Sequence, residues 1–324
     1  MKKVAIIGGE THIGEVTQLA GKQLTIVGAV VREDQKEWAR KTFNAPLFTE
    51  ESSLYAQAKP EIVAVANEND RKAAAVMGAL QKGCDVIVDK PFAITVAEQD
   101  RISQYLRAHP ERKLLMLLTL RGHPLWSGMR EQVRSGAIGA PAFCHVRMAV
   151  RLKRKERPLW FLDVQRSGGM FLDLLIHGID QVEWVTGARI KALTALTGNL
   201  GAPSDEHLRD HAAVFCELDN GGGAVVEGQR MLPDTKGSDY RMHVAGTQGY
   251  ADLTMADNRL TLTSPNGAEV AVKTLPEARS VVADWLAGGA LVDQESSLRT
   301  NRLAILATLA ADRRARLEAL ISAR

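Results

Sequence analysis

The chain has 324 residues, of which 45% are hydrophobic and 24% charged, and its formal net charge is +3. This composition is typical of a globular protein and excludes disordered and collagen-like chains. At about 150 residues per domain the length suggests two domains, and the small basic excess argues against a dedicated nucleic-acid-binding protein.

The first third of the chain alternates short apolar runs with helix-length segments. Buried strands are predicted at residues 4–7, 24–31, 62–66, 86–88 and 114–118. Between two of these strands, residues 71–82 place apolar side chains on one helical face and end at Gly83, a typical helix stop. Strands that alternate with helices predict a parallel sheet.

From about residue 121 the pattern changes to strands separated by glycine turns. Strands are predicted at residues 210–218, 223–231, 240–245, 249–255, 259–264 and 269–275, and helices at 124–135, 169–186 and 297–320. The turn at 219–222, Asp-Asn-Gly-Gly, can adopt the positive φ angles of a tight hairpin. The predicted fold class is α/β, with a parallel-sheet domain at 1–120 and an α+β domain at 121–324 that contains a large, open, mostly antiparallel sheet.

A glycine-rich loop follows the first predicted strand. Gly8, Gly9, Thr11, His12 and Ile13 stand where a Rossmann domain holds a pyrophosphate between a strand and a helix N-terminus. The pattern is incomplete, because Thr11 replaces the middle glycine of G-x-G-x-x-G. The loop is therefore either a dinucleotide site or a turn that joins a strand to a helix without any ligand.

Arg32 comes directly after the second predicted strand. An acidic residue at this point usually binds the ribose 2′-hydroxyl of NAD, whereas an arginine can hold the 2′-phosphate of NADP. Arg32 therefore favours NADP, with NAD as the second choice. The alternative is a solvated Arg32 whose field is partly cancelled by Glu33 and Asp34.

Asp89, Lys90 and Pro91 follow the predicted strand at 86–88. This is the carboxyl edge at which open parallel sheets bind ligands. Pro91 fixes the direction of the chain, so Lys90 is held at a strand end rather than within a ladder. A solvated strand end would explain the same residues.

Asp173 and His177 lie four residues apart after a double glycine, and hence on one face of a predicted helix. A single histidine on an apolar helix is more often a satisfied core residue than a catalytic one, but an Asp–His pair after two glycines favours catalysis. A metal site is a weaker alternative, because the sequence offers no further cluster of ligands.

Together these motifs resemble the Gfo/Idh/MocA family of oxidoreductases, and the resemblance covers nearly the whole chain. Asp89-Lys90-Pro91 is similar to the family's Glu-Lys-Pro, and residues 168–180 are similar to its double glycine followed by Asp, His and Asp. The resemblance implies an N-terminal Rossmann dinucleotide-binding domain and NAD(P)-dependent redox chemistry on sugars, polyols or related hydroxyl compounds. It also implies a homodimer or homotetramer formed through the C-terminal sheet.

The same resemblance implies roles for individual residues. His177 corresponds to a general acid/base, Lys90 to the cation that activates the hydroxyl or carbonyl, and Asp173 to a group that positions the substrate or the histidine. The implied cofactor-binding residues are Gly8, Gly9, Thr11, His12, Ile13, Arg32, Asn67, Asp89 and Lys90. Thr11, Arg32 and the segment around Asn67 depart from the family pattern. These departures keep a second hypothesis open, a non-catalytic ligand sensor or regulatory protein on the same fold.

A basic run precedes Trp160. It consists of Arg151, Lys153, Arg154, Lys155 and Arg157, with no aromatic residues among them, which argues against nucleic-acid binding. We expect a solvated loop. A sharper hypothesis is that the loop steers an anionic, sugar-like substrate.

The cysteines and the N-terminus bear on cellular location. Cys84, Cys144 and Cys216 show no paired spacing, so neither a disulfide framework nor a zinc site is predicted. The apolar run at residues 4–7 is too short for a signal peptide, and no stretch approaches membrane-spanning length. We therefore expect a cytoplasmic protein that binds no membrane and no metal.

Overall fold

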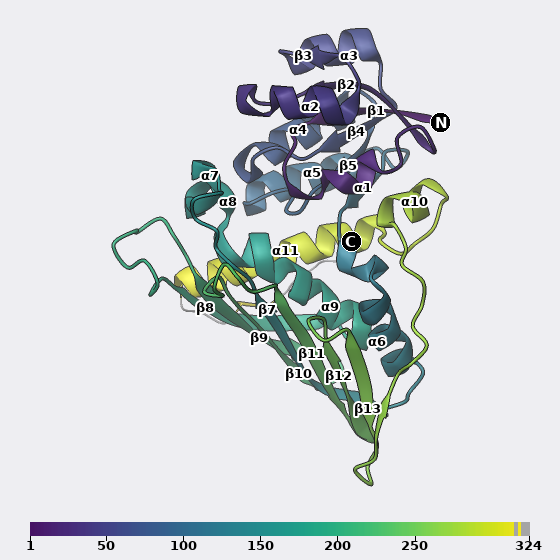
Figure 1. Cartoon of the computed structure of the whole chain (residues 1–324), viewed down its shortest axis with the longest axis vertical. Coiled ribbons are helices and arrows are strands. Elements are labelled where there is room, and N and C mark those ends of the chain that lie inside the picture. Colours follow the sequence, from purple (N-terminus) through teal and green to yellow (C-terminus); the bar gives the residue numbers. More distant parts are fainter. Residues whose placement is uncertain (314–316, 319–324) are drawn as a thin grey trace. The chain divides into compact units, whose positions relative to one another are not determined.

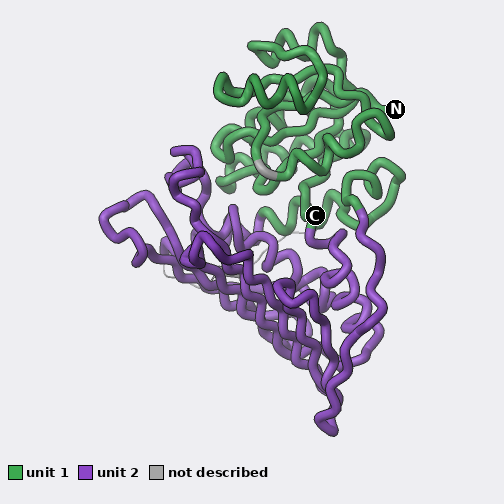
Figure 2. Tube along the Cα trace, in the orientation of Figure 1, with its two compact units in different colours: residues 1–119, 280–301 green, residues 120–279, 302–324 purple. Residues whose placement is uncertain are grey.

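The computed structural model describes residues 1–313 and 317–318, without the side chains of Thr11 and of the last two residues. It shows two compact units (Figures 1 and 2). Unit 1 comprises residues 1–119 and 280–301, and unit 2 comprises residues 120–279 and the described residues from 302 onward. The sequence-based division has a single boundary at residue 120, whereas the chain also returns to unit 1 between residues 280 and 301.

Unit 1 is built on a parallel sheet. Its strands are β1 (Lys2–Ile7), β2 (Leu24–Val30), β3 (Leu47–Phe48), β4 (Ile62–Val65), β5 (Asp85–Val88) and β6 (Leu114–Met116), in the order β3-β2-β1-β4-β5-β6. All five predicted strands are confirmed. The strand β3 was missed because it has only two residues. The connections reverse direction between β1 and β4, which makes this the switch point where such sheets bind ligands.

The helices of unit 1 follow its strands. They are α1 (Gly14–Thr17), α2 (Lys36–Phe43), α3 (Glu51–Ala58), α4 (Asn69–Gln81), α5 (Val96–Ala108) and α10 (Val281–Leu286), with 3₁₀ turns at Thr11–Ile13 and Glu33–Gln35. The predicted helix at 71–82 is confirmed as α4. The helix that follows the glycine loop, α1, has only four residues.

The returning segment belongs to unit 1 because it protects the edge of the sheet. The last helix, α11 (Gln294–Arg313), begins in unit 1, and there its Gln294 and Ser297 side chains accept hydrogen bonds from the amides of Leu114 (2.9 Å) and Met116 (3.0 Å) in the edge strand β6. An exposed edge would present these amides to other chains. Asn301, fully buried, also accepts from the Phe92 amide at 3.1 Å.

Unit 2 contains a nine-stranded sheet in the described residues. Its strands are β7 (Pro141–Ala149), β8 (Ile190–Gly198), β9 (His211–Leu218), β10 (Gly223–Gln229), β11 (Asp239–Gly246), β12 (Gly249–Thr254), β13 (Arg259–Thr263), β14 (Glu269–Ala271) and β15 (Leu317–Glu318). Their order is β14-β13-β12-β11-β7-β10-β9-β8-β15, and β7 with β10 is the parallel pair in an otherwise antiparallel sheet. The predicted hairpin of β9 and β10 is confirmed.

The helices of unit 2 cover the buried face of this sheet. Here α6 (Pro124–Arg134) and α9 (Ile176–Thr186) pack on each other, and α9 also packs on β7 and β10 (Figure 1). Two short helices, α7 (Leu159–Leu162) and α8 (Val164–Ser167), lie between β7 and α9 in the chain. The helix predicted at 169–186 is not uniform, because Phe171–Leu175 is π-helical. Short π-helical turns often occur at functional sites.

The prediction of the C-terminal helix is partly wrong. It was expected at residues 297–320, but α11 ends at Arg313, and β15 pairs with β8 through Leu317 and Leu193. Without β15, β8 would be an edge strand with unpaired backbone groups, and helical periodicity does not reveal such partners. The rest of that prediction, residues 314–316 and 319–320, lies outside the described residues. No helix in the described part of the chain is both long and apolar enough to cross a membrane.

Candidate functional site

A buried ion network surrounds the end of β5. The Asp89 carboxylate lies 2.7 Å from His12 Nδ1 and 3.5 Å from Lys72 Nζ. Burial alone would raise the pKa of Asp89, but the charges of Lys72 and His12 outweigh it and hold this pKa well below its usual range. Asp89 is therefore an anion that fixes two segments, the glycine loop through His12 and α4 through Lys72.

Lys72 extends this network to the main chain of Lys90. Its side chain is only 1% exposed, and Nζ donates to Asn69 Oδ1 at 2.9 Å and to the Lys90 carbonyl at 3.2 Å. A buried ammonium is stable only when such partners replace water. The structure thus brings together three predicted site residues, His12, Asp89 and Lys90, and adds Lys72, which the sequence analysis did not assign to the site.

The glycine loop is held between β2 and β4. The Gly8 amide donates to the Val30 carbonyl and the Glu10 amide to the Ala66 carbonyl, both at 2.8 Å. Gly8 has a φ of +84°, and a Cβ there would collide with the Ala66 backbone, so this position requires glycine. Gly9 faces the Trp38 indole ring. The backbone of Thr11 and Ile13 forms the 3₁₀ turn, and the Thr11 side chain lies outside the described part of the structure.

A cavity of about 510 Å³ opens at the carboxyl ends of β1, β2 and β4. Gly8, Arg32 and Asn67 line it, as do Gln35 and Glu68. The buried oxygens Gln35 Oε1 and Asn67 Oδ1 have no hydrogen-bond partner. Buried acceptors without partners fit a ligand that brings donors, such as ribose hydroxyls or an adenine amino group. The cavity, at the switch point of the sheet, therefore fits the adenosine part of a dinucleotide.

Arg32 lines this cavity, and its side chain is 28% exposed and bound by carboxylates. It donates to both oxygens of Asp34, each at 3.1 Å, and to Glu10, and its Nη1 lies 3.6 Å from Glu68. Burial alone would lower the pKa of Arg32, but the hydrogen bonds to Asp34 and Glu10 raise it. Glu33, the other acid suspected of cancelling its field, pairs with Lys36 instead.

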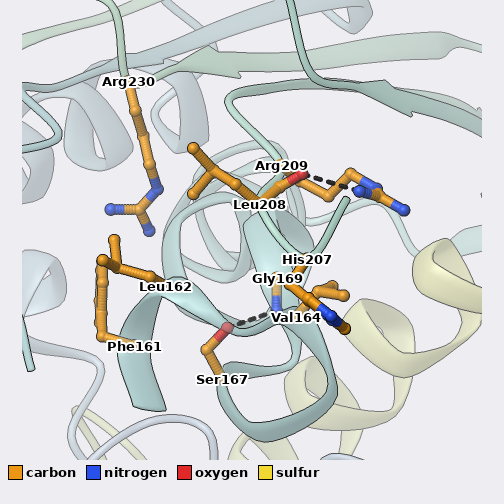
Figure 3. A pocket seen from close by; sticks show the side chains of 9 residues that line it. All are labelled: Phe161, Leu162, Val164, Ser167, Gly169, His207, Leu208, Arg209 and Arg230. Atoms are coloured by element: carbon orange, nitrogen blue, oxygen red, sulfur yellow. Dashed lines mark hydrogen bonds between the residues drawn. The ribbon is translucent and has the colours of Figure 1, made fainter. Parts of the chain in front are cut away.

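In unit 2 the double glycine turns the chain between α8 and the π-helical segment. Gly168 and Gly169 have φ angles of +78° and +71°, which favour glycine. The Gly169 amide donates to Ser167 Oγ at 3.2 Å (Figure 3). A Cβ at Gly169 would lie 2.8 Å from Val164 Cγ2. The turn thus sets where the helix that bears Asp173 and His177 begins.

Asp173 is paired with Arg230, a residue that the sequence analysis missed. Arg230 donates to the Asp173 carboxylate and, through Nε, to Met170 Sδ at 3.2 Å. Its guanidinium lies 4.6 Å from the centre of the Phe161 ring, beside a cavity of about 10 Å³, enough for one water (Figure 3). Burial and the Asp173 charge raise the pKa of nearby Tyr240 to about 12. Tyr240 is therefore uncharged at neutral pH.

His177 lies in the first turn of α9, and Asp180 one turn further along. His177 is 7% exposed, and its Nδ1 is buried. Asp180 binds Arg121 in a buried bidentate pair at 2.6 and 3.1 Å, which joins α9 to the 3₁₀ turn before α6. Asp180 is thus a structural residue. Asp173 lies in the π-helical segment and His177 in α9, which follows it directly, and their sharing of one helical face stays a prediction.

The predicted site residues therefore form two groups. Unit 1 holds the cofactor-binding candidates with Lys90, and unit 2 holds Asp173 and His177. No cluster of three or more potential metal ligands occurs among the described residues. In the basic run, Arg154 pairs with Asp205 at 2.5 Å and Lys153 with Glu156 at 2.6 Å.

Family models match both units. The model of the oxidoreductase family with an NAD-binding Rossmann fold matches residues 2–116, and the model of the GFO/IDH/MocA C-terminal domain matches residues 126–252. The chain is 26% identical over 256 residues to an inositol 2-dehydrogenase of Acidothermus cellulolyticus, an alignment that covers 78% of this chain and 72% of that protein.

Solved structures share the fold over almost the full length. A protein from Thermotoga maritima superimposes with a TM-score of 0.91 at 22% identity, over 98% of this chain and 99% of its own. A levoglucosan dehydrogenase, solved in complex with NADH and L-sorbose, gives a TM-score of 0.84 at 14% identity with the same coverage.

Proposed function

The chain belongs to the Gfo/Idh/MocA family of oxidoreductases, and from this we propose that it is a dehydrogenase or reductase that transfers hydride between a nicotinamide cofactor and a sugar or polyol. The observation that carries the proposal is the construction of the β5 end. There a buried network of His12, Asp89 and Lys72 holds the main chain of Lys90. A protein that only senses a ligand has no need of a lysine fixed in this way.

Each candidate residue has a chemical task in this reaction. A bound nicotinamide supplies the hydride acceptor. The chain supplies the proton chemistry: a His177 imidazole nitrogen takes the proton of the substrate hydroxyl, and the Lys90 ammonium stabilises the oxyanion that forms. Asp173, held by Arg230, orients the substrate or His177. On the cofactor side Gly8, Arg32 and Asn67 line the cavity, and His12 and Asp89 position the loop and the strand end.

The direct test measures nucleotide binding first and turnover second. Calorimetry with NADH and NADPH on the full chain should show binding of at least one of them. A panel of inositols, aldoses and alditols should then give nicotinamide reduction or oxidation, followed by absorbance. A folded protein that binds neither nucleotide contradicts the proposal and supports the sensor hypothesis.

We further propose that the substrate is anionic. Arg157 and Arg230 both lie over the Phe161 ring, at 4.2 and 4.6 Å from its centre, and a single carboxylate, Asp173, is paired with Arg230. Two guanidiniums stacked on one aromatic ring offer cationic groups that can bind an acidic or phosphorylated sugar. Turnover of an aldonate or uronate should exceed that of the matching neutral sugar and should fall as salt is added. Equal rates at all salt concentrations contradict this proposal.

We also propose that the protein forms a homodimer or homotetramer through the large sheet of unit 2. The helices α6 and α9 cover one face of this sheet. On the other face Phe143 of β7 and Phe215 of β9 are each 49% exposed, and Leu196 of β8 is 51% exposed. Large apolar side chains exposed on one sheet face are typical of a subunit interface.

We propose that the protein is located in the reducing cytoplasm. This location is supported by the three cysteines, which are all buried free thiols. Burial raises the pKa of the Cys84 and Cys144 thiols, which keeps them in the unreactive protonated form.

A further inference from the structure

The nucleotide cavity of unit 1 is more acidic than the sequence suggests. Three acidic side chains and two arginines line it, and two further carboxylates, Glu10 and Asp34, bind one of those arginines, Arg32. Glu10 comes from the glycine loop and Glu68 from the turn after β4. Neither is adjacent to Arg32 in the sequence, so the strand-end arginine alone gives no sign of them.

Three of the five N–H donors of Arg32 are already in use, one on each of its nitrogens. Nε and Nη2 bind the two oxygens of Asp34, and Nη1 binds Glu10 and lies 3.6 Å from Glu68. Glu10 is in turn fixed by Gln35, whose Nε2 donates to it at 2.9 Å. The guanidinium is thus oriented by acids of the protein itself.

We propose that Glu10, Asp34 and Glu68 make this site select NAD over NADP, by holding Arg32 as their own counter-ion. The inference rests on the proposed function and overturns the NADP preference that Arg32 alone favours. The three carboxylates are called the acidic collar below.

The physical argument compares the two forms of the ribose. A 2′-phosphate brings about two negative charges. To bind Arg32 it must share the guanidinium with Asp34 and Glu10, whose charges then stand beside its own, with Glu68 also close by. A 2′-hydroxyl carries no charge and can donate to an acceptor of the cavity. Gln35 Oε1 and Asn67 Oδ1 are buried acceptors without a partner, and they fit a hydroxyl but repel a phosphate.

The test is calorimetric titration of the full chain with NADH and with NADPH, which needs no substrate. We expect NADH to bind at least about tenfold more tightly, the scale of one hydrogen bond to a charged group. Replacing two carboxylates of the acidic collar, in the double variant Glu10→Gln/Asp34→Asn, should free Arg32 and reduce the NADH-to-NADPH preference by about tenfold or more. The single variant Glu10→Gln should move the preference in the same direction.

The matched control is Glu33→Gln. Glu33 is exposed, neighbours Arg32 in the sequence and pairs with Lys36, so the same loss of charge should leave the preference unchanged. Equal or tighter binding of NADPH by the wild-type protein overturns the inference alone, as does an unchanged preference in both collar variants. Binding of neither nucleotide to folded protein overturns the proposed function and the inference with it.

Discussion

Asp89 and Lys72 are both almost fully buried, so each charge needs the opposite charge of the other for its stabilisation. Removing one partner of a buried ion pair leaves the other uncompensated, which costs about 3–5 kcal/mol. We expect Asp89→Asn and Lys72→Met each to lower the free energy of unfolding of unit 1 by about this amount, and the double variant to lose less than the sum of the two. Urea denaturation of the four proteins measures the coupling, and additive losses would contradict it.

The same pair predicts a dependence on pH. The pKa of Asp89 lies well below its usual value in the folded protein, so the stabilisation is fully present above the pKa of the unfolded chain, about 3.9. It is lost as the pH falls further, through the lowered folded pKa. The stability difference between the wild type and Asp89→Asn should therefore stay constant from neutral pH down to about 5 and shrink below about 4. A difference that already disappears at pH 6 would assign the effect to another group.

The proposed proton chemistry makes Lys90 and His177 the most sensitive positions. Lys90→Met removes the cation and His177→Ala removes the acid/base, and each should lower kcat at least about a hundredfold. The circular dichroism spectrum and the melting temperature should stay close to those of the wild type. Lys82→Met, on an exposed residue that follows α4, is the matched control and should keep full activity. Near-normal turnover in either site variant would remove that residue from the mechanism.

Sequence motifs identified the candidate residues whose positions follow from the strand or helix that carries them. Lys90 stands directly after a strand, and Asp173 and His177 lie in consecutive helical segments, so local sequence was enough to select them. Arg230 and Glu10 could not be found in this way. Arg230 reaches Asp173 across 57 residues, and Glu10 reaches Arg32 across 22. Such partners depend on how strands and loops meet in the fold, so the sequence shows Arg32 without the Glu10 carboxylate that binds it.

At the scale of elements, α5 offers a direct test of local stabilisation. Thr95 Oγ1 accepts from the Glu98 amide at 3.2 Å, and the Glu98 carboxylate accepts from the Thr95 amide at 3.0 Å. This capping box satisfies free donors at the start of the helix. We expect Thr95→Ala to lower the free energy of unfolding by about 1 kcal/mol and to speed amide hydrogen exchange in the first turn of α5.

Thr42→Ala is the control for this prediction. Thr42 is exposed within α2 and does not stand at a helix start, so its replacement should change the stability by less than about 0.5 kcal/mol. Equal effects of the two substitutions would mean that the capping box contributes nothing beyond the loss of a threonine.

Hydrophobic periodicity predicted most helices and strands, and it failed where tertiary contacts determine the secondary structure. Runs of buried apolar residues identified β1, β4 and β5, whereas the two-residue β3 offers too little pattern. In β8 a bulge between Ile190 and Ala192 interrupts the alternation that marks a half-buried strand. The π-helical turn at Phe171–Leu175 also escaped prediction, because its residues are buried almost all round and present no amphipathic face.

At the scale of the whole molecule, the chain length and the change near residue 120 from alternating strands and helices to strands separated by glycine turns indicated two units. The return of residues 280–301 to unit 1 has no marker in the sequence. It depends on hydrogen bonds that the side chains of Gln294, Ser297 and Asn301 accept from backbone amides of unit 1. Polar residues on a helix surface are ordinary in a sequence, and only the fold shows that these cover a sheet edge.

The open face of the unit 2 sheet leads to a prediction about assembly. Phe143 and Phe215 are half exposed on the face away from α6 and α9, and the proposed contact with a second copy of the chain would bury them. We expect the wild type to sediment as a dimer or tetramer. The double variant Phe143→Glu/Phe215→Glu should sediment as a smaller species, because two charges cannot be desolvated in an apolar interface without a large cost.

The control for assembly must be an apolar residue that is exposed elsewhere in the same unit. Leu159 is 85% exposed and belongs to α7 rather than to the sheet. Leu159→Glu should therefore leave the sedimentation coefficient unchanged while it adds a similar charge to the surface. If the wild type is a monomer at all concentrations, or if the double variant sediments like the wild type, this face is not a subunit interface. If Leu159→Glu dissociates the protein instead, the interface lies over the loops around α7, and those loops rather than the sheet would join the subunits.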